Sequence, residues 1–300
     1  MANQKYEAFL KVLETGSFKE AARELGYTQA GMSYLVNSLE KELDTTLLVR
    51  DYGGARPTAE GADLAPLVQD VCNAERRLHA RAADLHHLEG GNVRVVTFTS
   101  TTIQWLPGIA KKFGLLHPSV ELDLACIDDQ AELEEAVWRG DYDVGFAVLP
   151  VRLNLRTVPL ARDPLLVAVA PDHPLAKAPF FPTSALSSEP YIRLESGASS
   201  EMDGVFRANG VEPRVRFSIV SDYAAMSLAS AGLGFSVLSS LILENAPFPL
   251  AALPPEVPVD REIALCLRPG EEASAAARAF VEVAQAWVGE ERAKGAPPSR

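Results

Sequence analysis

The stretch "GSFKEAARELGYTQAGMSYLVNSLEKEL", from Gly16 to Leu43, predicts two short helices joined by a tight turn. Ser17 and Glu20 form a capping-box pattern at the start of the first helix, and Gly26 stands where that helix would end. Thr28 is placed to cap the second helix. Two helices at this spacing are typical of a helix-turn-helix unit.

The residues on either side extend this unit. Tyr6, Phe9, Leu10 and Leu13 recur at helical spacing and predict an amphipathic helix before the quoted stretch. After it, "DTTLLVRDYGGARPT" predicts two short strands around a Gly-Gly turn. Residues 1–60 are therefore expected to form a winged helix-turn-helix domain.

The composition limits what such a domain can do. The chain has 300 residues, of which 47% are hydrophobic and 23% charged, with a formal net charge of -12 and a pI of about 5.0. Residues 1–60 hold seven Lys or Arg and nine Asp or Glu, a net charge of -2. A general nucleic-acid coat protein would be basic, so we expect any DNA contact to be local.

The sequence favours the cytoplasm and argues against a membrane protein. The start "MANQKYEAFL" lacks a basic segment followed by an apolar one, and no apolar run approaches the ~18 residues of a membrane span. None of Cys72, Cys126 and Cys266 belongs to a C-x-x-C pair, and an odd count suits a reducing compartment. Because Cys126 and Cys266 stand in apolar, strand-like runs, we expect both to be buried thiols. No metal or cofactor site is predicted.

A long helix is predicted between Thr58 and Glu89. Apolar residues recur along it at spacings of three and four, which is the pattern of a seam between paired helices. A helix packed on its own chain would show a similar stripe, but we favour pairing between subunits. Residues 61–91 are therefore taken as a linker and dimerisation helix that ends in a hinge. The seam consists of Leu64, Leu67, Val71, Ala74, Leu78, Ala82 and Leu85.

The remainder alternates strands with helices, which predicts an α/β domain with a parallel sheet. We expect two lobes within residues 92–294 and a ligand between them, at the carboxyl ends of the strands. Lobe one would comprise residues 92–162 and 268–294, and lobe two residues 163–267.

The chain resembles the LysR-type transcriptional regulators. The quoted helices, Arg50 and the later "PTAEG" follow that family's DNA-binding pattern, and "VAVAPDHPLA" and "ASAGLGFSVLS" are similar to its effector domain. The resemblance implies a periplasmic-binding-protein-like effector domain behind the winged helix. The chain departs from the pattern at Ala30-Gly31, where the family usually has Pro at the first position, and at Tyr34, where a basic residue is common.

The second helix of the opening stretch has no charged residue from Thr28 to Leu39. Its outward positions carry amide, hydroxyl and methyl groups, which suit the edges of bases. Arginines in the wing and hydroxyls at helix starts would then contact phosphates. A winged helix used only for protein contacts would show the same core stripe. The expected DNA-binding residues are Thr28, Gln29, Ala30, Ser33, Tyr34, Asn37, Arg50, Arg56 and Thr58.

Three turns are expected to bind the effector. "TSTT", residues 99–102, follows a strand and opens a helix, so it can seat an anion, although simple helix capping explains it equally well. "RLESGASSE" and "SDYAAM" offer similar helix starts on the other lobe, and Phe146 would form an apolar wall. The expected residues are Ser100, Thr101, Thr102, Phe146, Arg193, Ser196, Ser199 and Asp222.

The expected partners are double-stranded DNA and a small effector, for which a carboxylate is one candidate. A homodimer or homotetramer is expected, and RNA polymerase is a further candidate partner. No catalytic series is apparent, so we predict that the chain is not an enzyme. The rival interpretations are a solute-binding protein and a small-molecule enzyme on the same two-lobed fold.

Overall fold

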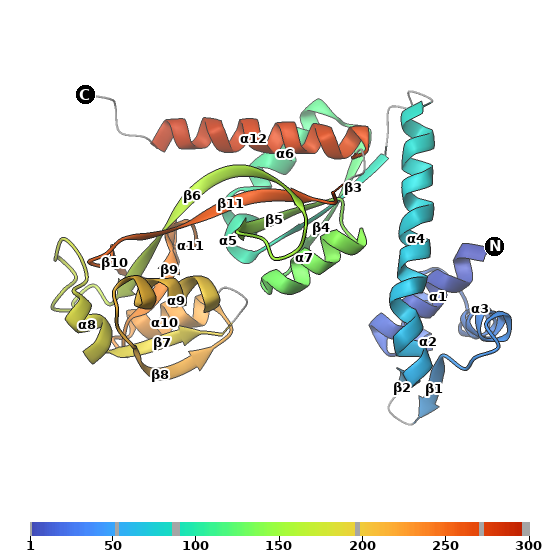
Figure 1. The fold of residues 1–300 in the computed structure, drawn as a ribbon, viewed down its shortest axis with the longest axis horizontal. Coiled ribbons are helices and arrows are strands. Elements are labelled where there is room, and N and C mark those ends of the chain that lie inside the picture. The colour runs from blue at the N-terminus through green and yellow to red at the C-terminus, as the bar shows by residue number, and fades with distance from the viewer. Residues whose placement is uncertain (1, 52–53, 86–90, 196–198, 270–272, 296–300) are drawn as a thin grey trace. The chain divides into compact units, whose positions relative to one another are not determined.

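The protein is described by a computed structural model covering residues 2–51, 54–85, 91–195, 199–269 and 273–295. The chain folds into two compact units (Figure 1): Met1–His87 with Arg139–Asp141, and Leu88–Trp138 with Tyr142–Arg300. None of the described helices is long and apolar enough to cross a membrane.

The first unit is a winged helix followed by one long helix. The sequence-predicted helix ends are confirmed. The Ser17 hydroxyl accepts a hydrogen bond from Glu20 N at 3.3 Å, and the Thr28 hydroxyl accepts one from Gly31 N at 3.0 Å. Gly26 has a φ of +71°, which glycine adopts at little cost. The elements are α1 (Ala2–Thr15), α2 (Phe18–Glu24), α3 (Gln29–Glu42), β1 (Leu48–Asp51), β2 (Gly54–Pro57) and α4 (Ala59–Leu85).

The wing is fixed to the helices by a close backbone approach. β1 and β2 pair antiparallel, and Ala55 N donates to Gly16 O at 2.7 Å, in the turn between α1 and α2. Gly54 has a φ of +124°, and a Cβ atom there would lie only 2.4 Å from the same oxygen. Only glycine fits at this position, so the Gly-Gly turn read from the sequence has a packing role as well as a turning one.

The three helices and the wing enclose one apolar core. Phe9 on α1, Met32 and Leu39 on α3, and Leu47 before the wing are all fully buried. Burying each such side chain contributes about 1.5–3 kcal/mol. This core holds α3 by one face and leaves its other face to solvent.

α4 carries a buried stripe and an exposed one. Val68 and Cys72 are buried, whereas Leu67, Val71 and Leu78 are 59%, 47% and 67% exposed. The exposed residues belong to the predicted seam. Three large apolar side chains left in water on one helix face are unusual unless a partner covers them.

The second unit is built on a mixed sheet in the order β10-β6-β11-β5-β3-β4, with β9 also paired to β6. β3 is parallel to β4 and β5, as the alternating pattern predicted, but β11 runs antiparallel to both β5 and β6. The elements are β3 (Gly91–Thr97), α5 (Thr99–Gln104), α6 (Leu106–Leu116), β4 (Val120–Cys126), α7 (Gln130–Arg139), β5 (Val144–Leu149), β6 (Arg156–Val169), α8 (Thr183–Ser188), β7 (Pro190–Leu194), α9 (Ser199–Ala208), β8 (Arg214–Ile219), α10 (Asp222–Ser230), β9 (Ser236–Ser239), α11 (Ser240–Leu243), β10 (Ala251–Leu253), β11 (Val259–Leu267) and α12 (Ala275–Gly295).

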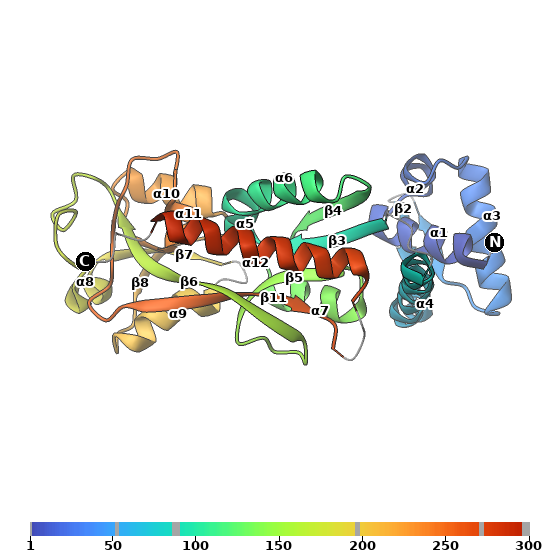
Figure 2. The ribbon, with the colours of Figure 1, turned by 90° about the horizontal axis from the view of Figure 1, so that it is seen from above.

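Two lobes share this sheet. Figure 1 shows the long strands β6 and β11 running side by side from one lobe into the other. The expected lobe boundary between residues 162 and 163 falls inside β6, so the strands themselves join the lobes. Lobe one carries α5, α6, α7 and α12, and α12 lies along α6 and the sheet (Figure 2). Lobe two carries the parallel pair β7-β8 with α8, α9 and α10.

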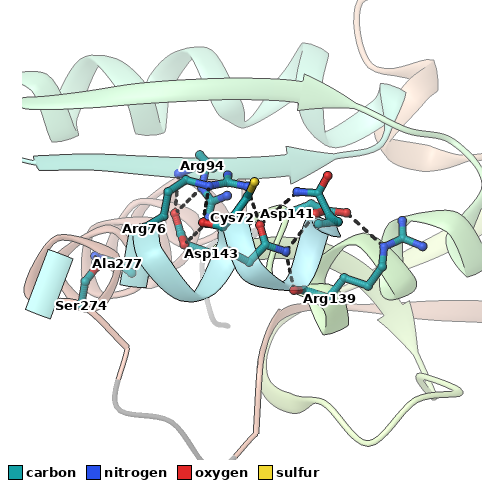
Figure 3. A network of polar contacts seen from close by, with 10 residues as sticks. Cys72, Arg76, Arg94, Arg139, Asp141, Asp143, Ser274 and Ala277 are labelled. Carbon is teal, nitrogen blue, oxygen red and sulfur yellow. Dashed lines mark hydrogen bonds and ion pairs between the residues drawn. The ribbon is translucent and has the colours of Figure 1, made fainter. Parts of the chain in front are cut away.

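An ion pair fixes the start of β5 against β3. Arg94 Nη2 donates to Asp143 Oδ1 at 2.7 Å and Arg94 Nε donates to Asp143 Oδ2 at 3.2 Å, as Figure 3 shows from close by. Asp143 N also donates to Arg94 O at 2.8 Å. A two-pronged arginine–carboxylate contact is geometrically specific. It therefore holds the parallel strands in register at the end opposite the cavity described below.

Candidate DNA-reading helix and effector cavity

The solvent face of α3 is polar and uncharged along most of its length. Gln29, Ala30, Tyr34 and Asn37 are exposed, with 74% of Tyr34 accessible, and Ser33 is half-buried beside them. These positions recur at the spacing of one helix face, opposite the buried Met32, Val36 and Leu39. Amide, hydroxyl and methyl groups on a single helix face can bond to base edges in a major groove.

The wing carries the arginines of this unit. Arg56 is exposed on β2, opposite Val49, and Arg50 lies on β1 opposite Ala55, although the side chain of Arg50 is outside the described residues.

The two threonines expected at helix starts already bond within the unit. The Thr28 hydroxyl caps α3 by accepting from Gly31 N. The Thr58 hydroxyl donates to Thr46 O at 2.7 Å and accepts from Gly61 N at 2.8 Å, which fixes the start of α4. Their hydroxyl groups are therefore structural, and any contact with phosphate would have to share them.

In the second unit a cavity opens between the two lobes and encloses about 490 Å³, part of it open to solvent. It lies beside the carboxyl ends of β3 and β4, where the parallel strands of such folds receive ligands. Lobe one contributes Phe98, Ser100, Ile127, Asp128, Gln130 and Leu133, lobe two contributes Met202, Asp222, Ser239 and Ile242, and Arg261 comes from β11.

The predicted anion seat at residues 99–102 is filled by the chain itself. Asp128 accepts hydrogen bonds from Thr99 N at 2.7 Å and from the Thr99 hydroxyl at 2.8 Å. The hydroxyls of Thr101 and Thr102 donate to Phe98 O at 2.9 and 3.0 Å. These two hydroxyls turn back to the backbone, as capping groups do, and neither residue lines the cavity.

A buried ion pair forms the floor of the cavity. Arg261 on β11 lies directly opposite Asp163 on β6, and its Nε and Nη2 donate to Asp163 Oδ2 at 2.9 and 2.8 Å. Arg261 Nη2 also donates to the Ser100 hydroxyl at 2.8 Å, while Asp163 Oδ1 accepts from Leu241 N at 3.0 Å. The guanidinium stands 5.1 Å from the centre of the Phe98 ring. The pair thus connects the shared strands to a helix of each lobe.

Arg261 and Asp163 were absent from the sequence-predicted site. The available signal was a charged residue inside each of two otherwise apolar strands, "VDREIALCL" and "LARDPLLVAV". A charge in a buried strand needs a partner, and each of these two residues supplies it for the other.

Gln130, although it lines the cavity, serves as a clamp between α7 and β5. Its amide nitrogen donates to Glu134 Oε1 at 2.8 Å and to Val148 O at 2.6 Å, and its oxygen accepts from Val148 N at 3.1 Å. The fully buried Glu134 also accepts from Arg152 N and Leu153 N at 2.7 and 3.1 Å. The polar groups of Gln130 are therefore committed to the fold.

The other expected effector residues divide into three groups. Ser100 and Asp222 line the cavity. Phe146 is fully buried in the core of lobe one and forms no wall of the cavity, because its strand lies in the middle of the sheet, and Arg193 on β7 does not line it either. Ser196 and the side chain of Ser199 lie outside the described residues.

The cysteines correct one expectation. Cys266 is buried as predicted, but Cys126 is exposed, because it ends β4 at the edge of the sheet. Burial raises the pKa of the Cys72 thiol to about 11 and that of Cys266 to about 12. Within the described residues, no group of three His, Cys, Asp or Glu side chains is placed to hold a metal ion.

Comparison with known protein families identifies both units. Residues 4–62 match the bacterial regulatory helix-turn-helix proteins of the lysR family, and residues 86–289 match the LysR substrate binding domain. The chain belongs to the LysR family. It is accordingly a DNA-binding transcriptional regulator with an effector-binding domain, and not an enzyme. The winged helix and the two-lobed α/β domain predicted from the sequence are confirmed.

Relatives match along nearly the whole chain. The uncharacterised regulator YvbU of Bacillus subtilis is 28% identical over 95% of this chain and 98% of its own length. The transcriptional activator CmpR of Synechocystis is 28% identical over 92% of each chain. Among solved structures, the LysR-family regulator CbnR superposes with a TM-score of 0.70 at 22% identity, covering 96% of this chain and 99% of its own. At that identity the superposition speaks for the fold alone.

Proposed function

We propose that α3 reads base edges in a promoter or operator through Gln29, Ala30, Ser33, Tyr34 and Asn37. The observation that carries the proposal is the exposed and uncharged face these residues form, held in place by the buried face behind it. Gln and Asn can form paired hydrogen bonds with adenine, and Ala30 suits a thymine methyl group. Each good paired contact gives about 1–3 kcal/mol of discrimination between bases.

Backbone anchoring falls to the wing and the helix starts. Arg50 and Arg56 supply positive charge on β1 and β2, and Thr28 and Thr58 stand where α3 and α4 present unpaired N–H groups. Few cations per subunit means weak binding by one copy, so we propose that two or four winged helices bind together.

The exposed stripe on α4 supports pairing of subunits. In this proposal Leu67, Val71 and Leu78 pack against the same stripe of a second copy, and the product is a homodimer or a homotetramer. The functional division is residues 1–60 for DNA, residues 61–91 for pairing and residues 92–294 for the effector. We place the protein in the cytoplasm, where promoter DNA and RNA polymerase are its partners.

The cavity between the lobes is the proposed effector site. Ser100 and Asp222 line it from the two lobes, and Arg261 lies at its floor on a strand common to both. A ligand that contacts both lobes stabilises one relative arrangement of them. We propose that this shift alters the assembly on DNA and so the activity of the promoter.

The proposal is tested by competition. The purified chain is bound to its own upstream intergenic DNA labelled with a fluorophore, and unlabelled copies of that DNA and of an unrelated sequence of equal length compete. The same-sequence DNA should compete at least about a hundredfold better, within the range of specific regulators. Equal competition by both DNAs would contradict sequence reading by α3.

A further inference from the structure

The charge balance of the cavity carries a further inference. Among the described residues that line it, the charged ones are Asp128, Asp222 and Arg261. The charge of Arg261 is already met by Asp163, whose carboxylate oxygen lies 2.8 Å away. Two carboxylates therefore remain to face a ligand, one on each lobe.

Asp128 occupies the place that a carboxylate ligand would need. It is exposed, and it takes both the backbone N–H and the hydroxyl of Thr99 at the start of α5. A ligand anion at this helix start would have to displace Asp128 or lie beside its negative charge. Asp222 is half-buried in the first turn of α10, on the opposite lobe.

The surroundings add no compensating positive charge from the floor. Burial, and next the charge of Asp163, raise the pKa of the Glu244 carboxyl group, so Asp163 still acts as a negative neighbour although Arg261 pairs with it. The remaining walls are apolar and are formed by Phe98, Ile127, Leu133, Met202 and Ile242. The cavity thus offers an apolar lining with carboxylates at two of its edges.

We propose that the effector is a cation: a small molecule with a protonated amine or guanidinium group on an apolar body. Asp128 and Asp222 are its anchors from the two lobes, and the apolar walls receive the rest of the molecule. The inference rests on the proposed role of the cavity as the effector site. The cavity and the family locate that site, and the carboxylates decide only the class of ligand. It replaces the carboxylate that the sequence suggested as a candidate effector.

The cationic class also explains how one ligand would engage both lobes. A single cation between Asp128 and Asp222 relieves the repulsion of two like charges across the cavity. A carboxylate would add a third negative charge to the same space. Ligand binding and closure of the lobes are then favoured by the same electrostatic change.

The test uses matched sets of probes with the full chain. Isobutyl, cyclohexylmethyl and benzyl skeletons are each taken as the amine, the neutral amide and the carboxylate, and binding is measured by ligand-observed NMR and by calorimetry. We expect amines to bind about tenfold or more tightly than carboxylates on the same skeleton. Asp128→Asn and Asp222→Asn should each weaken amine binding about three- to tenfold while leaving amide binding nearly unchanged.

Asp123→Asn is the matched control, because it removes the same charge from an exposed position on β4 that does not line the cavity. It should leave amine binding unchanged. Carboxylates that bind as well as amines, or the absence of any amine binding up to the solubility limit, would overturn the proposal. Competition between DNAs is measured separately without probe, so a wrong ligand class leaves the DNA result standing.

Discussion

Removing Asp163 tests the buried ion pair most sharply. In Asp163→Leu the guanidinium of Arg261 loses the acceptor of two hydrogen bonds at 2.8 and 2.9 Å, and Leu241 N loses its acceptor at 3.0 Å. The side chains of Asp163 and Arg261 are only 4% and 6% exposed, so water cannot replace the lost partner. Breaking such a pair on one side costs about 3–5 kcal/mol. For a domain of this size that corresponds to a melting temperature lower by about 6–20 °C.

The second half of the cycle separates a lost pair from lost packing. Arg261→Met alone strands the Asp163 carboxylate and should also cost about 3–5 kcal/mol. The double variant leaves no charge behind, only the unpaired N–H of Leu241 and hydroxyl of Ser100, so we expect a cost of about 1–3 kcal/mol. The coupling energy between the two positions is then about 3 kcal/mol or more.

The assay is urea unfolding of the full chain followed by tryptophan fluorescence. Trp105, Trp138 and Trp287 are the three tryptophans of the chain, and all lie in the second unit, so the signal reports that unit alone. Costs that simply add in the double variant, or a cost below about 1 kcal/mol for Asp163→Leu, would refute the reasoning about an uncompensated buried charge.

Four further outcomes are expected. Ser33→Ala should lower the preference for the specific site over unrelated DNA by about 1 kcal/mol in competition assays, with unfolding in urea nearly unchanged. Arg50→Ala should weaken binding to every DNA sequence and reduce the slope of log affinity against log salt by about 1, and an unchanged slope would remove this arginine from the phosphate contacts. Leu67→Glu combined with Leu78→Glu places charge on the exposed stripe of α4, so light scattering should show a smaller species than the wild type, and an equal mass would refute pairing there. In the folded chain Ellman's reagent should modify Cys126 alone, because burial raises the pKa of the other two thiols, and Cys126→Ser should abolish the reaction until the chain unfolds.

The winged helix was predictable because its signals are local. The hydroxyls of Ser17 and Thr28 lie three residues before the N–H groups they cap, and Gly26 stands at the turn between the helices. Patterns over such short distances depend little on the rest of the fold. The periodic apolar residues of α3 likewise predicted which face the core would hold.

The cavity was less predictable, because distant parts of the chain meet there. Arg261 and Asp163 are 98 residues apart, and Asp128 reaches Thr99 across 29 residues, so nothing local marks either contact. The exposure of Cys126 has the same origin: its apolar run reads as a buried strand, but the sheet order places it at an edge. Phe146 reads as a site residue only until the strand order places it in the middle of the sheet, where its side chain enters the core.

The most direct test of the central claim is a footprint of the full chain on its own upstream intergenic DNA across a salt series. The account predicts a discrete protected site with two half-sites, and an affinity that falls steeply as salt rises, because phosphate contacts from several subunits release counterions together. Diffuse protection with no preferred position, or no protection even at low salt, would contradict a winged helix that reads DNA.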